Sequence, residues 1–480
     1  MADLTDFYIN GSWINPADAD VLDVINPATE EPVGQISLGS ATDIDAAVAA
    51  ARAAFPAWSS TTVAERKAAL ERLTEVYRAR SEEMAVAIST EMGAPISMAT
   101  RAQVGAGLGH LMSFIAAIDD VEWVEVPDPE SPEHQLLREP TGVAALITPW
   151  NWPMNQVVLK VGAALAAGCT MVLKPSEIAP LSSMLFAEFV DAAELPAGVF
   201  NLVNGDGATA GSALTAHPEV DVISFTGSTR AGRLISQVAA ENITRISLEL
   251  GGKSPNLVFA DADLEKAVRS GVGSVMLNTG QSCNAPTRML VERNVYDDAV
   301  ALAAVAAEAT EVGDPAEEGR HIGPLSSAVQ FDKVQALIQQ GVDEGARLVA
   351  GGPGRPEGLE TGYYARPTVF ADVNNDMTIA REEIFGPVLV MIPFDTEEEA
   401  IEIANDTPYG LAAYVQTGDA ERARRVSRQL QSGMVQVNGA HRAPGAPFGG
   451  YKQSGIGREG GPLGIEEFLE VKAVSGMPIG

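Results

Sequence analysis

From about residue 143 to residue 252, short apolar runs alternate with longer segments whose apolar residues recur every three or four positions. The short runs are typical of buried strands and the longer segments of helices. The strand-like runs are VAALITP, TMVLKP, GVFNLVNG, DVISFTGS and RISLELGG. Strands this uniformly apolar, with a helix between each pair, predict a doubly wound parallel sheet covered on both faces.

In such a sheet, ligands bind beyond the carboxyl ends of the strands. The segments that fall at those ends are TPWN, KPSE, VNGDG, FTGS and LELGG. We therefore expect a binding crevice built from these five segments.

The flanking regions follow different patterns. Residues 41–118 are Ala-rich and helical, with Thr42 and Asp45 spaced as a capping box. A second α/β pattern follows Gly252 and predicts a second domain. Residues 122–140 have the proline-rich pattern of a β-ribbon that leaves the first domain and returns, and a projecting ribbon invites pairing with another chain.

Composition narrows the function classes. The chain has 480 residues, so two or three domains are expected. Its net charge of −32 disfavours nucleic acid and anionic membrane surfaces as partners. The amino-terminal segment is acidic, and prolines break the longest uncharged runs, which predicts a cytoplasmic protein without a spanning helix. The only cysteines, Cys169 and Cys283, are expected to be reduced, and no metal site is predicted.

Two strand-end motifs suit a dinucleotide. FTGSTRAGR places Gly227 and Gly232 between a strand and a helix, where backbone N–H groups favour phosphate, although such glycines are also common in ordinary turns. LKPSE places Lys174 and Glu177 at another strand end. A carboxylate there suits a ribose diol and repels a 2′-phosphate, which favours NAD over NADP, while a surface ion pair is the simpler alternative.

Three further side chains are candidates for catalysis. Glu249, between leucines in LELGGK, is expected to have a raised pKa suited to a general base. Cys283, at the end of GQSC, follows a turn where a thiolate would be nucleophilic, whereas Cys169 lies among apolar residues as a core filler. Asn151, in TPWNWP, presents an amide donor between rigid neighbours, as an oxyanion site needs. A capping carboxylate and a turn asparagine are the structural alternatives.

Taken together and in this order, these motifs resemble those of the NAD(P)-dependent aldehyde dehydrogenase superfamily. The resemblance extends from YINGSWINP to EEFLEVKAV and includes EEIFGPVLV, NDTPYGLAAYV and PFGGYKQSGIGREGG. It implies an aldehyde dehydrogenase-like α/β fold with a NAD-binding domain, a catalytic domain and an oligomerisation ribbon. The implied ranges are 1–121 with 141–251 for the NAD-binding domain, 252–439 for the catalytic domain, 122–140 with 460–480 for the ribbon, and 440–459 for a substrate loop.

The resemblance also implies a mechanism. Cys283 attacks the aldehyde, Asn151 and the Cys283 N–H hold the oxyanion, hydride passes to NAD(P), and Glu249 activates the water that hydrolyses the thioester. Relatives that transfer the acyl group to coenzyme A tend to lack this base, so a carboxylic acid is the expected product. Glu459 matches a glutamate sometimes assigned to proton relay.

Further site residues follow from the same resemblance. Lys174, also a catalytic candidate, and Glu177 meet the adenosine ribose, Gly227 and Ser228 the pyrophosphate, and Glu383 with Phe385 the nicotinamide end. The complete expected cofactor set is Ile147, Thr148, Pro149, Trp150, Lys174, Ser176, Glu177, Gly207, Phe225, Thr226, Gly227, Ser228, Leu250, Gly251, Glu383 and Phe385. Homodimers or homotetramers are expected.

Substrate choice is assigned to a tunnel and to the loop NGAHRAPGA. The expected tunnel residues are Trp152, Gln156, Leu159, Ser282 and Asn284. In so acidic a protein, His441 and Arg442 stand out as anchors for a distal carboxylate, which predicts a semialdehyde, or ω-oxo acid, as substrate. An arginine that faces solvent or a neighbouring subunit is the alternative.

Two other functions remain to be tested. A non-catalytic scaffold would keep the fold without needing the thiol, the amide or the acid. A cysteine acyl transferase or peptidase would need a partner histidine, and none lies near Cys283 in the sequence.

Overall fold

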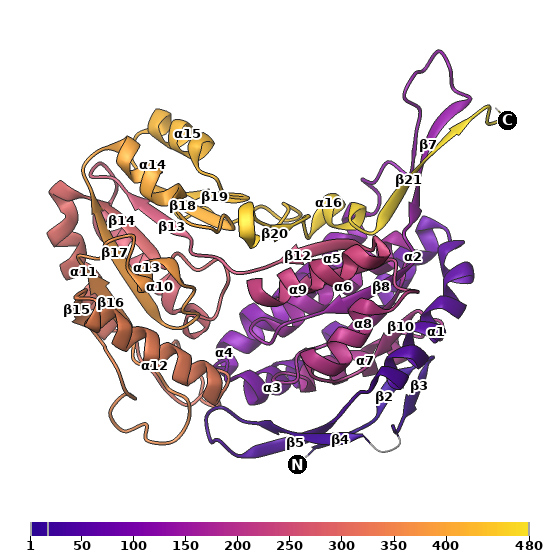
Figure 1. Ribbon diagram of the computed structural model, residues 1–480, viewed down its shortest axis with the longest axis horizontal. Helices are drawn as coiled ribbons and strands as arrows, with labels where there is room; N and C mark the ends of the chain where they lie inside the picture. Colours follow the sequence, from indigo (N-terminus) through magenta and orange to yellow (C-terminus); the bar gives the residue numbers. More distant parts are fainter. Residues whose placement is uncertain (1, 17–18, 479–480) are drawn as a thin grey trace.

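The computed structural model describes residues 2–16 and 19–478 and contains four β-sheets flanked by helices (Figure 1). Residues 1 and 17–18 of the predicted NAD-binding domain and residues 479–480 of the predicted ribbon lie outside the described residues. Within the described residues, every helix is too short or too polar to cross a lipid bilayer.

The largest sheet has eight strands, five of which are the strands predicted from the alternating pattern. Its strand order is β20, β12, β11, β8, β9, β10, β2, β3, and the five from β12 to β10 are parallel. In that order the strands are Gly455–Ile456, Arg245–Glu249, Val222–Thr226, Val143–Ile147, Thr170–Lys174, Phe200–Leu202, Phe7–Ile9 and Ser12–Ile14. From β8 the chain first adds β9 and β10 on one side and then β11 and β12 on the other, so the strand order reverses between β8 and β11. The doubly wound prediction is confirmed, and the crevice at this reversal is the expected ligand site.

Both faces of this sheet are buried, which explains its continuous apolar strands. On β8, Val143 and Ala145 pack into one core, while Ala144 and Leu146 pack into the core on the opposite face. The helices that connect the parallel strands are α6 (Pro153–Ala167), α7 (Leu181–Ala192), the π-helix η2 (Gly207–Gly211) with α8 (Ser212–Ala216), and α9 (Thr229–Asn242). Because side chains alternate along a strand, two apolar layers are needed to cover it.

An Ala-rich helical layer precedes this sheet in the sequence. It consists of α1 (Ala41–Ser59), α2 (Val63–Ala79), α3 (Ser81–Met92), α4 (Ile96–Met98), the π-helix η1 (Ala99–Gln103) and α5 (Val104–Ala117). The predicted cap at Thr42 and Asp45 is wrong by two residues, because Ser40 and Asp43 form the capping box of α1. Both pairs have the required spacing, but Ser40 has the extended backbone of a cap, whereas Thr42 is already helical. A small sheet of β1 (Ala2–Leu4), β5 (Pro32–Leu38) and β4 (Asp20–Ile25) completes this region.

A second sheet has seven strands, parallel except at the β15 edge. Its order is β15 (Arg347–Ala350), β16 (Thr368–Ala371), β17 (Val388–Phe394), β14 (Arg288–Glu292), β13 (Pro255–Val258), β18 (Ala412–Gln416) and β19 (Met434–Val437). The helices around it are α10 (Leu264–Met276), η3 (Leu277–Gly280), η4 (Arg293–Val295), α11 (Tyr296–Glu308), α12 (Ala328–Asp343), α13 (Thr378–Arg381), α14 (Glu397–Asn405) and α15 (Ala420–Gln429). The two large sheets lie side by side with the active-site segments between them (Figure 1).

The segment predicted as a ribbon projects from the body of the molecule (Figure 1). β7 (His134–Pro140) pairs antiparallel with β21 (Leu469–Ser475) on one side and with β6 (Val124–Glu125) on the other. Before β21, η5 (Lys452–Ser454) leads into β20, and α16 (Gly461–Glu466) packs on α5 and α6. Only the last part of the predicted 460–480 segment therefore belongs to the ribbon.

Candidate active site

The loop that carries Cys283 is held in a conformation that depends on glycine. After α10, Asn278 and Thr279 both have left-handed backbone angles, and Gly280 has φ +73°. A Cβ on Gly280 would lie 1.9 Å from the carbonyl oxygen of Gly386, and a Cβ on Gly252 would lie 2.3 Å from that of Cys283. The backbone is therefore pressed against its neighbours on both sides of the thiol, which fixes the position of the sulfur.

The Asn151 amide is tied directly to this loop. Asn151 is buried and its Nδ2 donates to the carbonyl oxygen of Gln281 at 2.9 Å. Asn278 Nδ2 donates to the same oxygen at 3.2 Å and to the Asn151 carbonyl at 2.8 Å. This network brings the predicted amide donor and the predicted nucleophile to one cavity, which both residues line.

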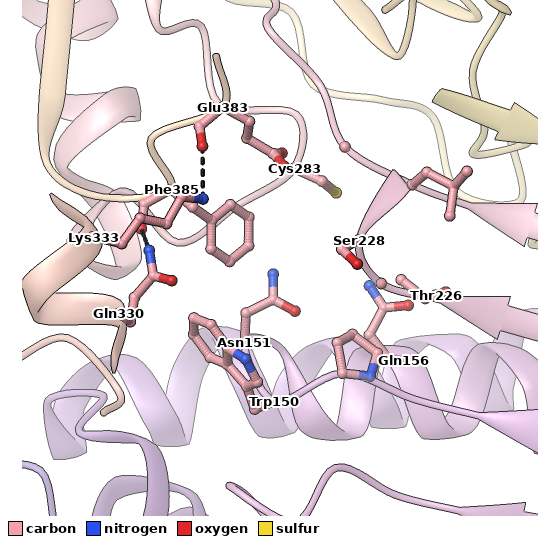
Figure 2. A pocket seen from close by; sticks show the side chains of 14 residues that line it. Trp150, Asn151, Gln156, Thr226, Ser228, Cys283, Gln330, Lys333, Glu383 and Phe385 are labelled. Carbon is pink, nitrogen blue, oxygen red and sulfur yellow. Dashed lines mark hydrogen bonds between the residues drawn. The ribbon is translucent and has the colours of Figure 1, made fainter. Parts of the chain in front are cut away.

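That cavity, here called the cofactor-side cavity, has a volume of about 200 Å³. In Figure 2 the side chains of Cys283, Asn151 and Phe385 point into it. It lies at the carboxyl ends of the parallel strands, at the topological reversal. It is lined by Pro149, Trp150, Asn151, Gln156, Thr226, Gly227, Ser228, Leu250, Gly251, Cys283, Gln330, Lys333, Glu383 and Phe385.

A second cavity, here called the tunnel-side cavity, has a volume of about 220 Å³. It is lined by Trp152, Asn155, Gln156, Cys283, Asn284, Met434, Gln436, Arg442 and Phe448. Cys283 and Gln156 line both cavities, so the sulfur lies where the two meet.

The surroundings of Cys283 favour the neutral thiol over the thiolate. Burial raises the pKa of Cys283, and the negative charges of Glu383 and Glu249 raise it further. The backbone N–H groups of Asn284 and Cys283 itself, which contact the sulfur, act in the opposite direction. These two groups already point toward the place where negative charge would develop during attack on a carbonyl.

Glu249 ends β12 in an almost fully buried position. Among the described residues, neither of its carboxyl oxygens has a hydrogen-bond partner. Burial raises its pKa well above the ordinary value, as does the charge of Glu459, while Lys160 and Arg458 act against this shift. Glu249 therefore has the properties of a buried general base.

Glu459 behaves differently because it has a cationic partner. Lys160 Nζ donates to Glu459 Oε1 and, at 3.0 Å, to Ser224 Oγ, and both charged side chains are buried. The opposite charges of Lys160 and Glu459 thus cancel, and the pair adds no net charge beside Glu249. Removal of either partner would leave an isolated buried charge.

The cofactor residues expected from the sequence fall into two groups. Nine of them line the cofactor-side cavity, namely Pro149, Trp150, Thr226, Gly227, Ser228, Leu250, Gly251, Glu383 and Phe385. The other seven lie outside that lining: Ile147, Thr148, Lys174, Ser176, Glu177, Gly207 and Phe225. Lys174, predicted as catalytic, ends β9, and its Nζ contacts Pro175 O at 2.9 Å and Glu177 Oε2 at 3.4 Å.

Glu383 and Phe385, the residues expected at the nicotinamide end, are held by two side chains that were not predicted from the sequence. Gln330 Nε2 donates to the Phe385 carbonyl at 2.7 Å, and Lys333 Nζ donates to the Glu383 carbonyl at 2.8 Å (Figure 2). The Glu383 carboxylate accepts from the Gly252 N–H at 3.0 Å. Gln330 and Lys333 lie on α12, far from any of the quoted motifs, so no local signal pointed to them.

The expected tunnel residues are only partly brought together. Trp152, Gln156, Asn284 and Arg442 line the tunnel-side cavity, whereas Leu159, Ser282 and His441 are not part of its lining. Ser282 Oγ instead accepts from the Trp152 indole at 2.8 Å. Asn155 was missed, although it lies one helical turn after Trp152 and beside Gln156, and helical spacing would have found it.

Cys169 differs from Cys283 in its location, because it lines neither cavity. It is fully buried in the core, its thiol donates to the Phe468 carbonyl at 3.3 Å, and burial raises its pKa to about 11. Its role as a core filler matches the expectation from its apolar surroundings.

The doubly wound sheet and the thiol placed between two cavities belong to an enzyme of the NAD(P)-dependent aldehyde dehydrogenase class. The chain belongs to the aldehyde dehydrogenase family, whose family model matches residues 13–474.

Individual relatives agree with this assignment. A Pseudomonas sp. protein named 3-succinoylsemialdehyde-pyridine dehydrogenase is 54% identical over 99% of both chains. The crystal structure of a Bartonella henselae aldehyde dehydrogenase is 55% identical, has a TM-score of 0.98, and is matched over 99% of this chain and 100% of that one. AldC from Pseudomonas syringae, solved as a cysteine-to-alanine mutant with NAD+ and octanal, is 51% identical, has a TM-score of 0.97 and is matched over 99% and 97%.

Proposed function

We propose that this protein oxidises an aldehyde to a carboxylic acid with NAD+ and water, and that Cys283 is its nucleophile. The observation that carries this proposal is that Cys283 and Gln156 line both cavities. A cofactor on one side and an aldehyde on the other would then meet at the sulfur. Neither partner would have to cross the site of the other.

The residues of the cofactor-side cavity fit a dinucleotide. Ser228 caps α9, so the first N–H groups of this helix face the cavity that Gly227 and Ser228 line. Thr226 Oγ1 and Gln156 Oε1, both buried in that lining, have no hydrogen-bond partner among the described residues. When bound, NAD+ supplies the acceptor for the hydride that leaves the aldehyde carbon.

Cys283 performs the first step as this chain's own chemistry. The thiol releases its proton to solvent as the sulfur adds to the carbonyl carbon, and the oxyanion of the resulting thiohemiacetal is held by Asn151 Nδ2 and the Cys283 N–H. To do so, the Asn151 amide turns from the Gln281 carbonyl, which keeps its second donor, Asn278. Loss of hydride then leaves a thioester on Cys283.

Glu249 performs the second step. Its carboxylate takes a proton from water, the resulting hydroxide adds to the thioester, and the carboxylic acid leaves as the Cys283 thiol is restored. Over both steps, one aldehyde, one NAD+ and one water give one acid, one NADH and one proton. The buried, unpartnered position of Glu249 supports this role, and it supports water over coenzyme A as acyl acceptor.

NAD is proposed over NADP because of Glu177. Its half-buried carboxylate lies 3.4 Å from Lys174 Nζ at the end of β9, where a ribose would lie in a sheet of this topology. A 2′-phosphate would meet that carboxylate. AldC and an aldehyde dehydrogenase from Bacillus cereus, which is 40% identical, were both solved with NAD+. Use of NADP at lower efficiency is compatible with this arrangement.

We further propose that the division into a NAD-binding domain, a catalytic domain and a ribbon holds, with α16 assigned to the NAD-binding domain instead of the ribbon, and that the ribbon makes a homodimer or homotetramer. Val124, Val126 and Val471 on the ribbon are exposed apolar side chains, which favours their burial against another subunit. Val471→Glu is expected to shift the sedimentation coefficient toward the monomer. A cytoplasmic location is proposed because a nucleophilic thiol needs a reducing compartment.

A semialdehyde, or ω-oxo acid, is proposed as the substrate class. Arg442 lines the tunnel-side cavity, and the Pseudomonas relative carries a semialdehyde in its printed name. The octanal complex of AldC shows that a relative also accepts an unsubstituted tail. His441 is exposed and outside the cavity lining, so Arg442 is the better anchor of the pair.

The test is a panel of aliphatic, aromatic and carboxylated aldehydes, assayed with NAD+ and NADP+, with and without coenzyme A. Formation of NADH and free acid is expected without coenzyme A. Cys283→Ala is expected to abolish turnover and to retain NAD+ binding. Full turnover by Cys283→Ala would refute the nucleophile assignment, and absence of turnover with every aldehyde would favour the non-catalytic scaffold.

A further inference from the structure

One wall of the tunnel-side cavity contains a histidine–amide pair to which the proposed chemistry gives no role. His110, on α5, places its Nε2 2.7 Å from Oδ1 of Asn155, on α6. Asn155 lines the cavity, whereas His110 lies behind it. Because an amide oxygen only accepts, His110 Nε2 must donate in this contact. The Nε2-protonated tautomer of His110 thus holds the Asn155 amide with its oxygen toward the ring.

This orientation has a chemical consequence for the cavity. With Oδ1 engaged by His110, the other end of the Asn155 amide is its NH₂ group, and no acceptor for this group exists among the described residues. Burial lowers the pKa of His110, and the charge of Arg442 also acts in this direction. The hydrogen bond with Asn155 and the charge of Glu459 act in the opposite direction, but the net lowering favours the neutral ring, which adds a donor without a charge.

Arg442 is the only lining residue of this cavity with a full positive charge. Its guanidinium lies 5.1 Å from the centre of the Phe448 ring, and its Nη1 is buried without a hydrogen-bond partner among residues 2–16 and 19–478. Glu459 and Glu249 are the acids that influence it, but neither forms an ion pair with it. Glu459 is already paired with Lys160. The cavity therefore has an uncompensated charge of +1.

We propose that the Asn155 NH₂ group and the Arg442 guanidinium together bind a carboxylate at the far end of the aldehyde, and that His110 is the positioning residue that makes Asn155 a donor. This inference rests on the proposed function and deepens it. A carboxylate matches both parts of the site, because it accepts from two donors and neutralises one positive charge. A ketone or ester tail would use the donors but leave the charge uncompensated.

The experiment uses the full-length enzyme and matched aldehydes. For each chain length, an ω-oxo acid, its methyl ester and the unsubstituted alkanal are compared by kcat/KM with NAD+. The ω-oxo acid is expected to exceed the alkanal by about tenfold or more, the value of a charge-assisted hydrogen bond. The ester is expected to lie near the alkanal.

The role of His110 is tested by variants that differ in one donor. His110→Phe keeps a ring but loses the N–H, so KM for the ω-oxo acid should rise about tenfold, with a smaller effect on kcat. His110→Gln keeps an N–H donor and is expected to restore most of the selectivity. In an Asn155→Leu background, His110→Phe should change the selectivity no further, because its effect acts through Asn155. His217→Phe, at a histidine away from both cavities, is the control.

The outcomes separate this inference from the proposed function. If no aldehyde gives NADH, the proposed function is refuted. If alkanals react but the ω-oxo acid has no advantage, or the ester equals it, the carboxylate site is refuted while the enzyme class stands. If His110→Phe lowers kcat/KM for all three tails alike, or if His110→Gln fails to rescue, His110 has only a structural role.

Discussion

The two cavities that meet at Cys283 are built in different ways. The cofactor-side cavity is formed largely by strand ends and by the turns that follow them, and two of its fourteen lining residues, Gly227 and Gly251, are glycines. The tunnel-side cavity is formed by side chains of Trp152 and α6, of the Cys283 loop, of β19 and of the 440–448 loop. The first is thus set by the fold itself. The second is set by side chains that can change without altering the fold.

This difference gives a rule that mutations can test. Substitutions that act on the sulfur or from the cofactor side are expected to change the rates for all aldehydes by a common factor. Substitutions on the tunnel side are expected to change the ranking of aldehydes instead.

The largest effect is expected for Glu249→Gln. Loss of the base should lower kcat by roughly 10²–10⁴-fold, while a first turnover of NADH persists because the thioester still forms. Stopped-flow absorbance of NADH checks this. In the native enzyme the raised pKa of Glu249 means that its active carboxylate form is lost as pH falls, so kcat should rise with pH up to values above the ordinary glutamate range. A steady-state loss without a burst would place Glu249 before hydride transfer.

Asn151→Ala is expected to lower kcat by roughly 10²–10³-fold, the value of one oxyanion donor. In contrast to Glu249→Gln, the burst itself should slow. The Gln281 carbonyl keeps Asn278 as a donor, so the melting temperature should change little. The decrease in kcat is expected to be the same factor for alkanals and ω-oxo acids. A decrease that depends on the tail would contradict the separate roles of the two cavities.

Glu177→Ala tests the cofactor side by its effect on the choice between NAD+ and NADP+. Removing the carboxylate is expected to lower KM for NADP+ by about tenfold, since a like charge next to the 2′-phosphate costs on the order of 1–2 kcal/mol near a surface. The Lys174 ammonium would then be free to meet that phosphate. Initial rates with both cofactors test this, and an unchanged NAD+ to NADP+ ratio would remove Glu177 from the ribose site.

The smallest effect is expected for Ser282→Ala. It removes the acceptor for the Trp152 indole, a net loss of about 0.5–1.5 kcal/mol, and so loosens one wall of the tunnel. Selectivity between short and bulky aldehydes should change by roughly three- to tenfold. Because Ser282 adjoins Cys283, a uniform loss across all aldehydes would instead indicate that the sulfur has moved.

Prediction from the sequence was strongest where the order of strands and helices along the chain also determines where the functional residues lie. The five parallel strands and the strand-end residues from Pro149 to Gly251 could be predicted because a βαβ pattern dictates both. Gln330 and Lys333 could not, because they reach the site only through the packing of α12. His110 could not either, since its importance depends on its distance from Asn155, which no spacing in the sequence encodes.

The predicted cap of α1 shows a second limit. Two overlapping pairs, Ser40 with Asp43 and Thr42 with Asp45, satisfy the same rule, and only the backbone at residue 40 decides between them. Local motifs fix the presence of a helix better than its first residue.

At Gly252 and Gly280 the backbone around Cys283 lies so close to neighbouring carbonyl oxygens that an added methyl group would force the turn apart. A new activity that required the sulfur to move would therefore disrupt this turn. New activities are expected to arise from exchanges at the cavity-lining residues Asn155 and Gln156 of α6 and in the 440–448 loop, and these are the positions at which directed evolution of this enzyme would best be randomised.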